Sequence, residues 1–222
     1  GGYGMSAASV GSSVAWGVIA LLSVGVGGYA LFHAATGFTH LPITNPMFDP
    51  WGLQTHVAAS GVAMILGAFQ FLKPLRRKAP TLHRWMGRVY VLACVVGGLA
   101  GGSIALSSTA GPIAGWGFFM LAVLWVPFTL MALFAAMRRD FTSHEIWMIR
   151  SFALTFGAVT LRLQLPLAGY LGATGVIPSD FVWSYQYIAW LAWVPNLIVA
   201  ELFIATIRKP RRPKVTPAAA PA

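Results

Sequence analysis

Six apolar stretches, each long enough to cross a lipid bilayer, constrain this chain more than any other feature of its sequence. They cover residues 12–36, 53–73, 82–107, 114–137, 144–168 and 183–207. A membrane-spanning helix needs about 20 mostly apolar residues, and in lipid its backbone groups must be hydrogen-bonded within the segment itself. The sequence therefore predicts an all-α, polytopic membrane helical bundle with six transmembrane helices, forming a single domain over residues 5–208.

The composition excludes the main soluble classes. Hydrophobic residues make up 57% of the chain and charged residues only 9%, whereas a soluble domain carries about 25% charged residues. The net charge of +10 would suit nucleic-acid binding, but nearly all lysines and arginines lie beside apolar stretches, at 73–88, 138–150 and 208–214. Basic residues placed in this way orient a membrane protein, so we expect the lipid bilayer, and not nucleic acid, as the partner.

Charge in the connecting segments predicts the orientation of the helices. Lysines and arginines occur in the segments 74–81 and 138–143 and in the tail, but not in the segments 37–52, 108–113 and 169–182. By the positive-inside rule, both termini then lie in the cytoplasm.

The two ends of the chain are not expected to belong to the bundle. We interpret residues 1–4, which precede Met5, as the remnant of an expression tag. The basic tail 209–222 is rich in proline and alanine, and we expect it to be disordered.

A motif that occurs twice suggests an internal repeat. An arginine pair, a histidine and a Trp-Met-x-Arg sequence follow one another at 76–77, His83 and 85–88, and again at 138–139, His144 and 147–150. In both copies the arginine pair ends one helix and the histidine opens the next. This predicts a four-helix core over residues 53–168, built as a repeat of two hairpins. Independent selection of the same anchors at two cytoplasmic helix ends is the alternative.

Helical periodicity places His144 and Arg162 on one face of the helix predicted at 144–168, with Ser151 and Thr155 between them. At a rise of about 1.5 Å per residue, His144 and Arg162 are about 27 Å apart and lie near opposite membrane surfaces. Because a charged side chain in lipid is costly, we expect Arg162 to face the protein interior and His144 to face inward with it.

The helix predicted at 82–107 carries mainly small residues on the face behind His83. That face consists of Gly87, Tyr90, Cys94, Gly97 or Gly98, and Gly101. Such a face is explained either by close helix packing or by space for a flat, bulky ligand.

His83 and His144 are the centre of the functional hypothesis. In an up-down bundle, the third and fifth spans lie on a diagonal, so their imidazoles can reach one metal between them. Axial imidazoles hold the iron of haem, and arginine pairs can neutralise carboxylates at its edge. We therefore expect haem b ligated by these two residues. Motifs of zinc hydrolases, serine hydrolases, P-loop proteins and dinucleotide-binding proteins are absent from the sequence.

Arg162 and His56 form a second candidate site at the outer level, where we also expect His33, His40, Asp49 and Asp180. Arg162 and His56 could bind a quinone head group, a haem propionate or a small anion. Alternatively, Arg162 pairs with Asp49 or Asp180 and only stabilises the bundle.

The sequences around His56, at 82–90, and from 144–151 to Arg162 resemble a bacterial family of multi-pass membrane proteins known only as a domain of unknown function. This resemblance covers residues 53–168 and implies a location in the bacterial inner membrane. The layout is also similar to cytochrome b561 and the di-haem membrane cytochromes. That similarity implies b haems between histidines of alternate helices and electron transfer from a quinone or a soluble donor to an acceptor.

The similarity to these cytochromes is incomplete. A second haem would need a histidine on the span at 114–137, which has none, unless His33 takes its place. We therefore expect one haem b and a membrane oxidoreductase that uses a quinone. The alternatives are a small transporter and an accessory subunit of a larger membrane complex, neither of them an enzyme.

Overall fold

The structure, a computed structural model, describes residues 7–38, 50–108 and 110–208. Within these ranges the chain forms nine α-helices and no strand. The helices are α1 (Ala7–Thr36), α2 (Pro50–Gln70), α3 (Lys73–Lys78), α4 (Pro80–Ala105), α5 (Pro112–Met137), α6 (Phe141–Thr155), α7 (Gly157–Ala173), α8 (Phe181–Leu191) and α9 (Val194–Arg208).

The predicted six-span, all-α architecture is confirmed. Six segments of the described chain are long and apolar enough to cross a membrane. Four of them are the single helices α1, α2, α4 and α5, whereas the fifth combines α6 with α7 and the sixth combines α8 with α9. The interpreted tag remnant and the basic tail lie outside the described residues.

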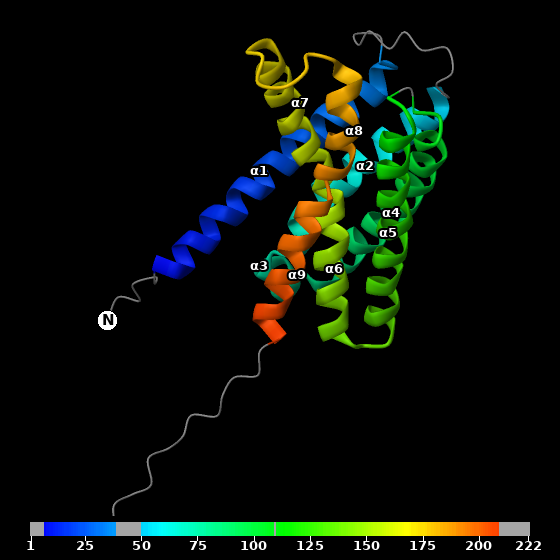
Figure 1. Cartoon of the computed structure of the whole chain (residues 1–222). Helices are drawn as coiled ribbons and strands as arrows, with labels where there is room; N and C mark the ends of the chain where they lie inside the picture. Colours follow the sequence, from blue (N-terminus) through cyan, green and yellow to red (C-terminus); the bar gives the residue numbers. More distant parts are fainter. Residues whose placement is uncertain (1–6, 39–49, 109, 209–222) are drawn as a thin grey trace, which may run out of the picture.

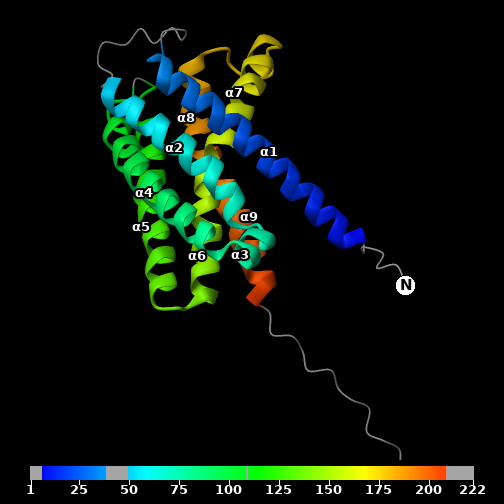
Figure 2. The ribbon, with the colours of Figure 1, turned by 180° about the vertical axis from the view of Figure 1, so that it is seen from behind.

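Four helices, α2, α4, α5 and α6, form the core of the bundle (Figure 1). Both α2 and α5 pack against α4 and against α6, so α4 and α6 stand on a diagonal, as predicted for the spans at 82–107 and 144–168. Outside this core, α8 packs on α5 and α9 packs on α6. Helix α1 packs on α2, but its N-terminal half leaves the bundle in both views (Figures 1 and 2).

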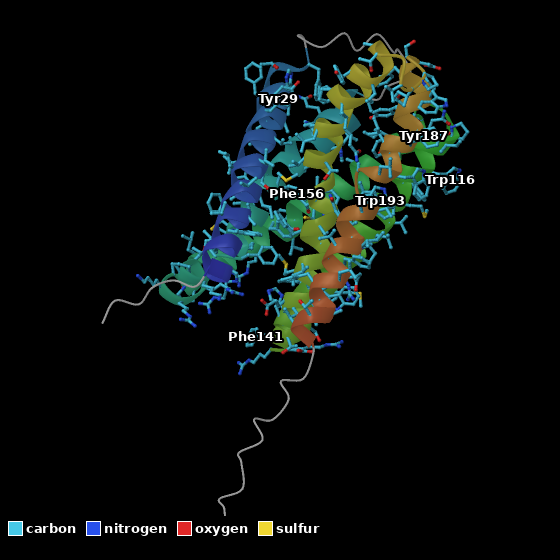
Figure 3. All side chains as sticks on the ribbon, turned by 60° about the vertical axis from the view of Figure 1, so that its left-hand side comes forward. Tyr29, Trp116, Phe141, Phe156, Tyr187 and Trp193 are labelled. Carbon is cyan, nitrogen blue, oxygen red and sulfur yellow. The ribbon has the colours of Figure 1, made fainter. Side chains whose placement is uncertain are left out.

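Basic side chains gather at one end of the bundle. Helix α3, the turn between α5 and α6, and the end of α9 all lie at this end (Figures 1 and 2). Side chains ending in nitrogen are concentrated there in Figure 3. We call it the basic end, and its members include Lys73, Arg76, Arg77, Lys78, Arg138 and Arg139.

The turn between α5 and α6 fixes the start of α6. Arg139 adopts a φ of 61°, a left-handed conformation that is uncommon outside glycine and reverses the chain here. Asp140 then caps α6, because its Oδ1 accepts a hydrogen bond from the Ser143 backbone N–H at 3.0 Å. The helix that carries His144 is therefore anchored within its first turn.

Two spans are broken at the same height. Pro195 explains the break between α8 and α9, because proline lacks an N–H and clashes with the preceding turn. Gly157, which opens α7, packs against that break, since a Cβ at this position would lie 3.3 Å from the Ala192 carbonyl oxygen. Figure 3 shows Phe156 and Trp193, one beside each break, at one level. The span at 144–168, expected to be one helix, is therefore two.

A cluster of hydroxyl groups fills the centre of the core. The Tyr90 hydroxyl lies 2.8 Å from Ser151 Oγ and 3.1 Å from Thr155 Oγ1. Trp125 Nε1 donates to Thr155 Oγ1 at 2.8 Å, and Thr129 Oγ1 lies 2.6 Å from Ser151 Oγ. All five side chains are buried, and their mutual pairing joins α4, α5 and α6 at fixed relative depths.

Candidate functional site

The hydroxyl cluster shows that His83 and His144 lie at one depth. Tyr90 on α4 meets Ser151 on α6 across the diagonal. His83 precedes Tyr90 by the same number of residues as His144 precedes Ser151, two helical turns or about 10.5 Å. Because α4 and α6 both start at the basic end, the two imidazoles lie there together, each on the side of its helix that faces the other.

A backbone carbonyl orients the imidazole of His144. Its Nδ1 lies 2.8 Å from the carbonyl oxygen of Ala132 on α5. A carbonyl can only accept a hydrogen bond, so Nδ1 carries the hydrogen and the Nε2 of the neutral ring keeps its lone pair. Metal-binding histidines are commonly oriented in this way.

Two buried polar atoms at the level of His83 have no hydrogen-bond partner among the described residues: Nδ1 of His83 itself and Nε2 of Gln70 on α2. A Cβ at Gly87, one turn beyond His83, would lie 3.4 Å from Gln70 Oε1, which places Gln70 at this level. His83 also interacts electrostatically with His144 and Arg76. Unpaired buried polar atoms are rare and are typical of sites that bind a ligand or water.

Charged residues surround the histidine pair at the surface of the basic end. Arg76 Nη1 lies 4.0 Å from Glu145 Oε1, and both side chains are more than a third exposed, so this ion pair is weak. Hydrogen bonds from the side chain and backbone of Ser143 lower the pKa of the Asp140 carboxyl, so Asp140 stays ionised while it caps α6.

Between the depth of His83 and the opposite end, the small-residue face of α4 is closely packed. A Cβ added to Gly67 of α2 would lie 2.8 Å from Tyr90 Cε2, and a Cβ on Gly98 would clash with Val126 of α5. Close helix packing is therefore the explanation for this part of the face. A cavity of about 120 Å³ beside α7 and α8 and one of about 50 Å³ between α1, α2 and α7 both lie away from His83 and His144.

His56 is fixed at the opposite end of the bundle. Its Nδ1 lies 2.7 Å from the carbonyl oxygen of Gly97, so Nδ1 is the donor and Nε2 is the nitrogen left for another partner. The ring packs against Gly101, where a Cβ would lie 2.5 Å from Nδ1. Glycine at this position therefore lets α2 and α4 approach closely.

Arg162 and His56 line one cavity of about 50 Å³ between α1, α2 and α7. The structure thus brings together the two residues expected at the outer level. Arg162 Nη1 donates to the Ala158 carbonyl at 3.0 Å, and the guanidinium carbon lies 5.9 Å from the centre of the Tyr29 ring. Arg162 forms no ion pair with any residue in the described part of the chain.

The other residues expected at the outer level have different positions. Asp180 caps α8, because its Oδ1 accepts from the Val182 backbone N–H at 2.8 Å. Asp49 and His40 lie outside the described residues. The buried ring of His33 packs against aromatic side chains of its own segment, Tyr29, Phe32 and Phe38.

Arg150 on α6 forms an ion pair with Glu201 on α9: its Nε lies 2.5 Å and its Nη2 lies 2.9 Å from the two carboxylate oxygens. The contribution of Trp125 and Thr129 on α5 to the hydroxyl cluster was not predicted from the sequence. The spacing of Trp125 and Thr129, one helical turn, was the available signal.

The fold and these two polar sites define an all-helical, multi-pass membrane protein. The chain belongs to the family of predicted membrane proteins designated DUF2306, which matches residues 53–204, more than half of the sequence. This confirms the resemblance to a membrane protein family of unknown function. No curated protein and no solved structure is detectably similar to the chain. Among the described residues, no group of three or more His, Cys, Asp or Glu side chains could hold a metal ion.

Proposed function

We propose that the protein is a membrane electron carrier that binds haem b between His83 and His144 at the basic end. The observation that carries this proposal is the common depth of the two histidines on diagonal, parallel helices. Imidazoles that project from facing helices into a bundle core are suited to hold a haem iron. Haem b, when bound, would supply one-electron transfer.

The donor atoms at the basic end fit this role. The Ala132 carbonyl holds Nδ1 of His144, which leaves Nε2 as the ligand atom. The unpaired Nδ1 of His83 and the unpaired amide of Gln70 indicate that the local polar groups are not satisfied by the protein alone.

Basic residues around the pair would serve the edge of such a group. Arg76 interacts electrostatically with His83, and among the described residues its carboxylate partner is Glu145, at 4.0 Å. Arg138 and Arg139 are exposed beside the start of α6. These guanidinium groups can neutralise propionate carboxylates, which we propose as their function.

We further propose that the basic end faces the cytoplasm of a bacterial inner membrane, following the positive-inside rule. A quinone is the lipid-soluble partner expected from the sequence. The cavity that Arg162 and His56 line measures about 50 Å³, which is small for a quinone head group. Pockets for drug-sized ligands measure about 300–1,000 Å³.

The alternative of a small transporter draws on the two helix breaks, since discontinuous helices often form transport sites near the midplane. Such sites use backbone carbonyls freed by the breaks. Here Asn196 Nδ2 lies 3.1 Å from the Ala192 oxygen, 3.4 Å from the Ala153 oxygen and 2.9 Å from Thr160 Oγ1. Asn196 already pairs with these groups, so the electron carrier is the better supported function.

Absorption spectroscopy of protein purified from cells with ample haem supply tests the proposal. We expect a b-type spectrum that changes on reduction with dithionite. His83→Ala and His144→Ala should each abolish it, whereas His56→Ala, at the opposite end of the bundle, is the matched control and should retain it. Colourless wild-type protein, or loss of the spectrum in His56→Ala alone, would contradict the proposal.

A further inference from the structure

A cationic side chain, Arg162, lines the cavity between α1, α2 and α7 and has no acidic partner among the described residues. The ion pairs within the described part of the chain are Arg76 with Glu145 and Arg150 with Glu201, and neither includes Arg162. Arg162 lies inside a membrane span. A charged side chain at membrane depth is costly unless its charge is compensated.

The groups that line the cavity are suited to an anion. Ala158 accepts from one of the five N–H groups of Arg162, and no described residue accepts from the other four. Ser60 also lines the cavity, and its Oγ lies 3.5 Å from His56 Nδ1. The hydrogen of His56 Nδ1 is directed at the Gly97 carbonyl. The rest of the wall is apolar, formed by Val26, Gly27, Ala30, Val57, Gly61 and Met64.

We infer that this cavity binds a carboxylate head group, with Arg162 as the cationic donor and Ser60 as a second donor. A carboxylate pairs with arginine through two parallel hydrogen bonds and supplies the missing negative charge. It also fits the size of the site, because about 50 Å³ holds a group of a few atoms, given that one water molecule takes about 30 Å³ in the liquid. A quinone is neutral and larger, so it meets neither requirement.

A fatty acid is the source of carboxylate that the surroundings favour. The apolar part of the wall comes mainly from α1 and α2. Helix α1 leaves the bundle toward the basic end (Figures 1 and 2), so an acyl chain attached to the bound carboxylate can extend into lipid. This site lies at the opposite end from His83 and His144, and the inference is independent of haem binding.

Equilibrium binding of radiolabelled laurate to the full chain, delipidated in detergent, tests the inference. We expect saturable binding that unlabelled laurate displaces and lauryl alcohol, the uncharged analogue, does not. Acetate and chloride distinguish the source: weak competition supports a fatty acid, and competition as strong as that of laurate supports a small soluble carboxylate or anion at the same site. Binding that does not saturate, or equal displacement by lauryl alcohol, would show only partition into apolar surface and overturn the inference.

Variants connect the binding to Arg162. Arg162→Gln should weaken laurate binding at least tenfold, Arg162→Lys should weaken it less, and Arg88→Gln, an exposed arginine of α4 at the basic end, should leave it unchanged. If Arg162→Gln does not fold, Ser60→Ala should still weaken binding severalfold in folded protein. Unaltered affinity in Arg162→Gln or in Ser60→Ala would contradict the assigned donors. If Asp49→Asn lowers the melting temperature as much as Arg162→Gln and laurate does not bind, Asp49 is the counter-charge and the inference is wrong.

Discussion

The hydroxyl groups of Tyr90 and Ser151 lie 2.8 Å apart across the diagonal of the four-helix core. Helices α4 and α6 run parallel. A residue of α4 and a residue of α6 therefore lie at the same depth when they precede Tyr90 and Ser151, respectively, by the same number of positions. His83 and His144, two turns away, form such a pair. The geometry of the proposed haem site therefore depends on packing at the centre of the bundle.

Removal of the Tyr90 hydroxyl should loosen this arrangement. Tyr90→Phe leaves the hydroxyls of Ser151 and Thr155 without one of their partners in a buried position, which costs about 1–3 kcal/mol. Thermal unfolding in detergent measures the loss. Tyr187→Phe is the control, since Tyr187 is exposed on α8, and an equal loss in both variants would show that the buried contact adds no stability.

Gly67→Ala should destabilise the bundle, whereas Gly25→Ala should not. A Cβ at Gly67 would lie 2.7 Å from Phe152 Cδ2 and 2.8 Å from Tyr90 Cε2, and overpacking of this kind costs about 1–3 kcal/mol. No atom lies within 4 Å of a Cβ at Gly25, and alanine favours helix more than glycine does. Melting temperatures of the two variants compare these cases directly. Similar values would mean that α2 and α4 separate more easily than their packing implies.

His56→Asn should preserve the fold better than His56→Leu does. The side-chain amide of asparagine can donate to the Gly97 carbonyl in place of Nδ1, whereas leucine leaves that carbonyl without its side-chain donor. The difference in the free energy of unfolding should be about 1 kcal/mol. If the leucine variant is as stable as the asparagine variant, the bond between His56 and Gly97 does not stabilise the contact between α2 and α4.

The ion pair between Arg150 and Glu201 should contribute modestly to the attachment of α9 to α6. The Arg150 side chain is 16% exposed and the Glu201 side chain 46%, so the protein buries the pair only in part. We expect a loss of about 1 kcal/mol in Glu201→Gln. The reversed pair, Arg150→Glu with Glu201→Arg, should recover part of it. Unfolding at low and high salt concentrations checks the electrostatic origin, because a loss independent of salt points to packing instead.

Labelling of single cysteines in intact cells tests the orientation. Cys94 is free and buried, so Cys94→Ser provides a background without native thiols. In this background, Ser107→Cys, between α4 and α5, should react with a membrane-impermeant reagent added outside. Thr142→Cys, at the basic end, should react only after the membrane is permeabilised. The reverse pattern would place the basic end outside the cytoplasm.

The spans could be predicted because the length and apolarity of a segment are local properties of the sequence. The common depth of His83 and His144 followed from helical periodicity and from the order of the helices. The hydrogen bond from His144 Nδ1 to Ala132 could not be predicted, because it depends on how α5 is rotated about its axis relative to α6.

The break between α6 and α7, beside Gly157, could not be predicted from the sequence either. No proline follows it within a turn, and Phe156 keeps a helical φ of −66°. The interruption becomes visible only through the contact with Ala192, a residue far away in sequence. The cavity at Arg162 could not be predicted either, because part of its wall comes from α1 and depends on how α1 packs against α2.

The family match begins at residue 53, so α1 lies outside it, although Val26, Gly27 and Ala30 of α1 form part of the wall around Arg162. A relative reduced to the matched region would present this guanidinium directly to the hydrocarbon of the bilayer. Members that keep an arginine here should therefore also keep a preceding span, and members that have lost that span should carry an uncharged residue in its place.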